Sequence, residues 1–108
     1  MINNTIYQKL QSVAKKQSII HYEEVGKLAD LDMQNPVDRE KISEILDEIS
    51  THEHSQGRPL LSAVVVLKRE CVPGEGFFKM AQKIGLFDGK NEEKFFSDEL
   101  KRVYEKWK

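Results

Sequence analysis

RPLLSAVVVLKRECVPGEGFFKMAQKIG, residues 58–85, contains the only long apolar run of the chain. The run is short, rich in valine and flanked by Pro59 and Pro73, which favours a strand covered on both faces over a helix. We expect amphipathic helices to pack against that strand. The stretch therefore predicts three elements in order: a strand over 60–68, a turn over 69–74 and a short helix over 76–84.

Outside this stretch, apolar residues recur at the spacing of amphipathic helices. Ser18 to His21 are too few for a helix and predict a short extended piece that bridges to the main strand. Asparagines stand where helix N-caps are needed, at Asn4, Asn35 and Asn91. The predicted helices cover residues 4–16, 22–29, 36 to about 52, and 92 to near the C-terminus.

The order helix, short strand, helix, helix, strand, turn resembles a winged helix, in which three helices pack against a small antiparallel sheet. We therefore predict a single α+β domain over residues 1–108, mostly helical and winged-helix-like, with a small antiparallel sheet. The length of 108 residues is typical of one domain.

SIIHYEEVGKLADL, residues 18–31, resembles the I-T-Y-G-E-L-A opening of the DNA-binding domain in alkylguanine-DNA alkyltransferases and their alkyltransferase-like relatives. Residues 59–66, followed by GEGFF, fall where that family has its active-site strand and a glycine-rich turn. The family's nucleophilic cysteine follows a proline, in Pro-Cys-His-Arg, whereas Leu60 follows Pro59 here and Cys71 lies well downstream. The resemblance therefore implies a DNA-binding scaffold without alkyl transfer. PLLSAVVV with PGEGFF is also similar to small uncharacterised prokaryotic proteins, which suggests no activity.

Charge is distributed unevenly along the chain. The net charge is −1, but residues 1–18 carry three lysines and no acid, whereas residues 22–53 carry ten acids and three basic residues. The predicted third helix therefore presents an acidic face, which repels phosphate and argues against its use as a DNA-reading helix. No apolar stretch is long enough to span a bilayer, and the single cysteine favours a reducing compartment. We expect a cytoplasmic protein with no membrane association.

Motifs that carry chemistry do not add up to a catalytic set. Cys71 has no histidine beside it in the sequence to activate the thiol. His52 and His54 are two residues apart at the end of a helix, so their imidazoles point to different sides. Gly74-Glu75-Gly76 lacks the third glycine of a nucleotide-binding fingerprint. We therefore predict no catalytic residue, no metal site and no cofactor.

Two binding functions stay open, a nucleic-acid-binding module and a protein-interaction or adaptor module. In the first, helices over 22–50 and the turn over 69–74 form the binding side. Arg58, at the entrance to the buried strand, either pairs with an acid such as Glu48 or Glu53 or is held out for a ligand. In the second, the last helix docks another protein or a second copy, as a homodimer. The candidate nucleic-acid-binding residues are Lys15, Lys16, Arg58, Lys68 and Arg69; the candidate partner-binding residues are Phe95, Tyr104 and Trp107.

Overall fold

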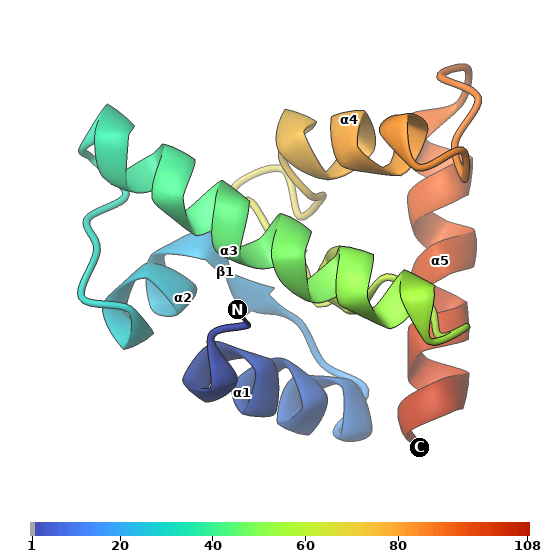
Figure 1. The fold of residues 1–108 in the computed structure, drawn as a ribbon, viewed down its shortest axis with the longest axis horizontal. Helices are drawn as coiled ribbons and strands as arrows, with labels where there is room; N and C mark the ends of the chain where they lie inside the picture. Colours follow the sequence, from blue (N-terminus) through green and yellow to red (C-terminus); the bar gives the residue numbers. More distant parts are fainter. Residues whose placement is uncertain (1) are drawn as a thin grey trace.

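The computed structural model describes residues 2–108, and five α-helices dominate it. Helix α3 crosses the middle of the molecule, with α1 and α2 on one side, α4 on the other, and α5 closing one end (Figure 1). The elements follow in the order α1 (Asn4–Lys15), β1 (Ile20–His21), α2 (Tyr22–Leu28), α3 (Pro36–Ser55), the 3₁₀ helix η1 (Leu61–Val64), β2 (Val65–Val66), α4 (Glu75–Lys83) and α5 (Glu92–Trp107).

The valine-rich run is buried, as predicted, but it is not one long strand. Leu60, Leu61 and Ala63–Val66 are all at 0% exposure; Leu61–Val64 contact α1, α3 and α5, and Val65–Val66 contact β1 and α2. Only Val65–Val66 are in a strand, while Leu61–Val64 wind into η1. The predicted strand over 60–68 is therefore wrong in conformation, although its burial is confirmed.

The two strands pair in parallel, not antiparallel as predicted. Ile20 lies opposite Val65, and His21 lies opposite Val66. A tight turn can join antiparallel strands, whereas parallel strands need a longer crossover connection. Helices α2 and α3 provide that crossover here, so the chain re-enters the sheet in the same direction.

Buried polar side chains explain why residues 58–62 do not extend the sheet. The Leu60 N–H donates to Glu99 Oε2 at 2.7 Å, and the Ser62 N–H donates to Ser50 Oγ at 3.0 Å. The Arg58 N–H donates to the Glu53 backbone carbonyl at 2.9 Å. Because side chains and a helix end take these donors, no neighbouring strand is needed to satisfy them.

Asparagine side chains begin three of the helices. Asn3, Asn35 and Asn91 accept hydrogen bonds of 2.9–3.1 Å from backbone N–H groups two or three residues further on. The caps at Asn35 and Asn91 are confirmed, whereas the first cap is Asn3 and not Asn4, which already lies inside α1. No helix within residues 2–108 combines the length and the apolar character needed to cross a membrane.

Glu99→Ala tests the buried anchor of this segment. The substitution leaves the Leu60 N–H buried without an acceptor and removes the carboxylate that binds Arg102. We expect the free energy of unfolding to fall by about 3 kcal/mol, measured by urea denaturation followed by circular dichroism. The control is Glu105→Ala, an exposed position on the same helix, with an expected change below about 0.5 kcal/mol. Equal losses in the two variants would contradict the anchoring role.

Candidate functional site

The five candidate nucleic-acid-binding residues do not form one patch. Lys15 and Lys16 are exposed at the end of α1, beside the last turns of α5 (Figure 1). Lys68 and Arg69 are exposed on the turn that leads into α4. These four residues are thus two pairs of sequence neighbours, on α1 and on the turn, and Arg58 is held at a third place by Glu53.

Arg58 is bound to Glu53, one of the two partners that its position suggested. Its Nε and Nη2 donate to Glu53 Oε2 at 3.1 and 2.6 Å, and the Tyr7 hydroxyl donates to the same oxygen at 2.9 Å. The Glu53 side chain is fully buried, whereas a quarter of the Arg58 side chain is exposed. The hydrogen bond to Glu53 is the main reason that the pKa of Arg58 is raised. Arg58 therefore has a structural partner and still reaches the surface.

The candidate partner-binding aromatics of α5 contact the fold itself. Phe95 does not lean outward as expected, since its ring packs against Phe77, Phe78 and Phe87 at centroid distances of 6.0, 6.5 and 4.9 Å. The Tyr104 hydroxyl donates to the Ser18 carbonyl at 2.7 Å. Trp107 is half-buried against the core. That these side chains bind another protein stays a prediction.

The chemistry-bearing motifs also lie apart. Cys71 is a free, exposed thiol on a residue with φ of +56°. His52 packs edge-on against the Tyr7 ring, and His21 Nδ1 lies 3.4 Å from Glu24 Oε1. Over residues 2–108, no three His, Cys, Asp or Glu side chains are placed to hold a metal ion.

A groove of about 500 Å³ opens between α2, α3 and the start of α4; we call it the Tyr22 groove. The Tyr22 hydroxyl accepts a hydrogen bond from the Gly74 N–H at 2.8 Å and so fixes the turn before α4. Gly76 permits the close approach of α3, since a Cβ there would lie 2.6 Å from Ser43 Oγ. Apolar side chains that line the groove are Met33, Leu46, Leu67 and Phe77, and polar ones are Arg39, Glu40, Ser43, Asp47, Ser62 and Glu75.

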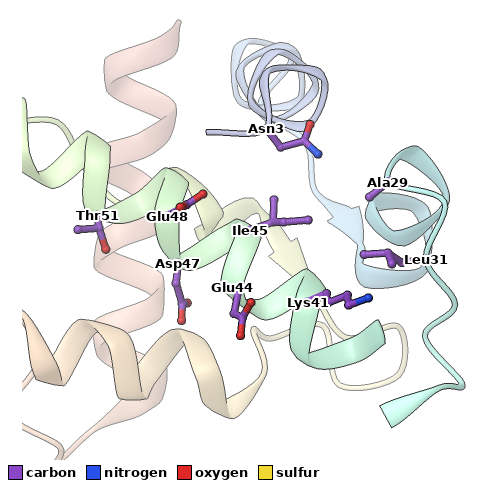
Figure 2. A pocket seen from close by; sticks show the side chains of 9 residues that line it. All are labelled: Asn3, Ala29, Leu31, Lys41, Glu44, Ile45, Asp47, Glu48 and Thr51. Atoms are coloured by element: carbon purple, nitrogen blue, oxygen red, sulfur yellow. The ribbon is translucent and has the colours of Figure 1, made fainter. Parts of the chain in front are cut away.

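Asp47 lies where this groove meets its neighbours. It also lines a groove of about 460 Å³ further along α4, and an open groove of about 740 Å³ along α3 that Asn3, Ala29 and Leu31 also line; we call the latter the outer groove. Figure 2 shows this outer groove, with Glu44 and Asp47 directed toward α4 and with Ile45 and Glu48 on the other side of α3. The acidic face predicted for the third helix is therefore present, and Asp47 is the carboxylate common to all three grooves.

Burial makes Asp47 a titratable group near neutral pH. Its partial burial, with the Glu44 carboxylate as a second cause, raises the pKa of Asp47 to about 6, while Lys83 acts in the opposite direction. Burial also raises the pKa of Tyr22, so its hydroxyl keeps its proton. The Tyr22 oxygen accepts from Gly74, which leaves the hydroxyl hydrogen free to donate. The groove thus offers a donor at Tyr22 and an acceptor at Asp47.

Sequence reasoning did not single out Tyr22 and Asp47 as site residues. Tyr22 meets Gly74 across 52 residues of chain, a contact that no local pattern reveals. Ser43 and Asp47 are four residues apart on one helix face, which is the signal that could have placed them together. A scan of protein-family models, a search of curated proteins and a search of solved structures each found no match to this chain.

Asp47→Asn tests the desolvation of this carboxylate. Its pKa is raised from 3.8 to about 6, so the folded state holds the proton over a pH range in which the unfolded chain has lost it. The stability from this group is therefore fully present below pH 3.8 and is lost as pH rises through about 6. Because Asp47 is half exposed, we expect Asp47→Asn to be more stable than the parent by no more than about 1 kcal/mol at pH 8.

Urea midpoints of the parent and the variant, compared at pH 8 and pH 4, measure this effect. The difference in urea midpoint between Asp47→Asn and the parent should shrink toward zero at pH 4. Glu70→Gln, at an exposed position outside the helices, is the matched control, and we expect it to change stability by less than about 0.5 kcal/mol. A stability gain of the same size at both pH values would contradict a desolvated Asp47.

Proposed function

We propose that this chain is a non-enzymatic, winged-helix-like module that binds nucleic acid, and that its binding side is the Tyr22 groove. The observation that carries the proposal is the groove itself, about 500 Å³ in volume with apolar residues, an aromatic ring and hydrogen-bonding groups in its lining. Its volume is within the range of about 300–1,000 Å³ found for sites that hold small molecules. The lining draws on the helices over 22–50 and on Gly74 at the end of the turn over 69–74, the segments that the sequence predicts as the binding side.

A single unstacked base fits the chemistry of the groove better than a sugar–phosphate backbone does. Glu40, Asp47 and Glu75 line the groove and repel phosphate. A carboxylate can instead accept a hydrogen bond from the exocyclic amino group of a base, as acidic residues do with cytosine. Aromatic side chains such as Tyr22 bind unpaired bases of any sequence by stacking. The groove therefore favours single-stranded nucleic acid or an unpaired base.

Basic residues for the phosphates line the groove or follow its lining residue Leu67 in the chain; we call Arg39, Lys68 and Arg69 the rim. Arg39 is exposed and contributes to the lining, and exposed Lys68 and Arg69 begin the turn that ends at Gly74. Phosphate contacts of this kind position a nucleic acid without selecting its sequence. With so few cations and a net charge of −1, the binding relies on the base as well as on the backbone.

A combined Arg39→Ala, Lys68→Ala and Arg69→Ala variant tests the rim. We expect single-stranded DNA binding, measured by fluorescence anisotropy at low salt, to weaken by about tenfold or more. The slope of log affinity against log salt should fall by about one for each phosphate contact removed. Asp47→Asn should instead change the preference among homopolymers of the four bases and leave the salt slope unchanged.

Lys9→Ala is the control, because Lys9 is exposed on α1, on the opposite side of α3 from α4 (Figure 1). Duplex DNA with and without one unpaired base tests whether the groove takes a base. A parent protein that binds no oligonucleotide at tens of micromolar and low salt would remove nucleic acid as the ligand. If the rim variant binds single-stranded DNA as tightly as the parent, the binding site lies outside the Tyr22 groove.

A further inference from the structure

A fourth groove, of about 580 Å³, lies between α5 and the segment that follows α3; we call it the Arg102 groove. It shares no lining residue with the Tyr22 groove. Three basic residues line it: Arg58, Arg102 and Lys106. The lining also includes the exposed carboxylate of Glu105 and the apolar side chains of Pro59 and Leu86.

Both arginines of this groove are held by buried carboxylates. Arg58 binds Glu53, whose side chain is 0% exposed, and Arg102 Nη1 donates to Glu99 Oε1 at 3.0 Å, with the Glu99 side chain 2% exposed. The Arg102 side chain itself is 64% exposed, and its Nε and Nη2 have no acceptor among the described residues. The buried Glu99 carboxylate therefore holds one end of the Arg102 guanidinium group, while its remaining donors face solvent.

Fixed guanidinium groups lower the entropy lost when a ligand binds. An unpaired arginine on a helix surface must give up its rotamer freedom to grip a carboxylate, whereas one already held loses less. The planar fork of arginine matches a carboxylate with two parallel hydrogen bonds. Lys106 follows Arg102 by four residues and stands on the same helix face, where it can bind the same anion.

The apolar part of the groove defines the rest of the ligand. Pro59 lines it beside Arg58, and Leu86 is one of the large apolar side chains that the fold leaves exposed, at 39%. A ligand that places a carboxylate on Arg102 can cover these residues with a neighbouring apolar side chain. We propose that the Arg102 groove binds an acidic segment of a partner protein, in which glutamate or aspartate stands beside a leucine-like residue.

The charge balance favours such a peptide over nucleic acid. Arg58, Arg102 and Lys106 are matched by the carboxylates of Glu53, Glu99 and Glu105, so the groove has little net positive charge. A polyanion with regularly spaced phosphates gains most from released counterions, which requires uncompensated cations. Glu105 would also repel a second phosphate next to the first. A peptide with isolated carboxylates gains hydrogen bonds and apolar contact without that repulsion.

NMR spectroscopy of the ¹⁵N-labelled chain, with the arginine Nε–H signals included, tests the proposal. The probe is a short, capped peptide with one glutamate flanked by leucines, compared with the same peptide carrying glutamine in its place. We expect saturable shifts confined to residues 54–59, Leu86 and residues 99–106 with the glutamate peptide. Arg102→Ala combined with Lys106→Ala should weaken binding by about tenfold or more. The affinity of Arg102→Lys for the peptide should fall between those of the parent and the double variant, because lysine keeps the positive charge but lacks the planar fork of donors.

Lys101→Ala, exposed on α5 and not part of the groove lining, is the matched control and should leave binding unchanged. Equal binding of the glutamine peptide, or no shift at millimolar glutamate peptide, would overturn the proposal. Displacement of the peptide by single-stranded DNA would also overturn it, because the groove would then be a phosphate site. The rim variant of the Tyr22 groove should bind the peptide normally, so the failure of one proposal is separable from that of the other.

Discussion

Two buried glutamates hold the centre of this molecule. Glu53 from α3 and Glu99 from α5 turn their carboxylates onto the short segment that carries Arg58 and Leu60. A buried carboxylate is tolerated only when donors compensate it, and here those donors are two arginines, a tyrosine hydroxyl and a backbone N–H. Because the donors come from several parts of the chain, the two carboxylates set where α3 and α5 can lie relative to the buried run.

This constraint also shapes the buried run itself. The backbone donors of Leu60 and Ser62 are taken by side chains of α5 and α3, so the chain winds into η1 before it reaches a strand partner. Only Val65 and Val66 remain to pair with β1. The sheet is thus a short parallel contact inside a helical domain, and most of the cohesion comes from helices packed around an apolar segment.

Local patterns predicted what depends on neighbours in sequence. The burial of the valine run, the extent of the helices and the caps at Asn35 and Asn91 each follow from residues within one or two turns. The pairing of Arg58 with Glu53 was also within reach, since the two are five residues apart. The 3₁₀ helix could not be predicted from local patterns, because its cause lies in Ser50 and Glu99, which accept from backbone N–H groups 12 and 39 residues away. Strand direction likewise depends on the path of α2 and α3, which apolar periodicity does not encode.

The candidate sites follow the same division. Apolar and charged stripes predicted an acidic third helix, and this is observed, but its meaning comes from the grooves that meet at Asp47. No local pattern shows that Tyr22 closes on Gly74 or that Arg102 reaches the same groove as Arg58. Asp47 and Glu53 stand on one helix, yet Asp47 is partly buried beside Glu44, with Lys83 as an opposing charge, whereas Oε2 of the buried Glu53 accepts from Arg58 and Tyr7. A carboxylate at the wall of a groove gains from a ligand that supplies a donor, whereas one that holds a buried arginine contact serves to position its neighbour. That difference in physical role, more than charge or exposure, separates the residues that we propose to face a ligand from those that hold the fold.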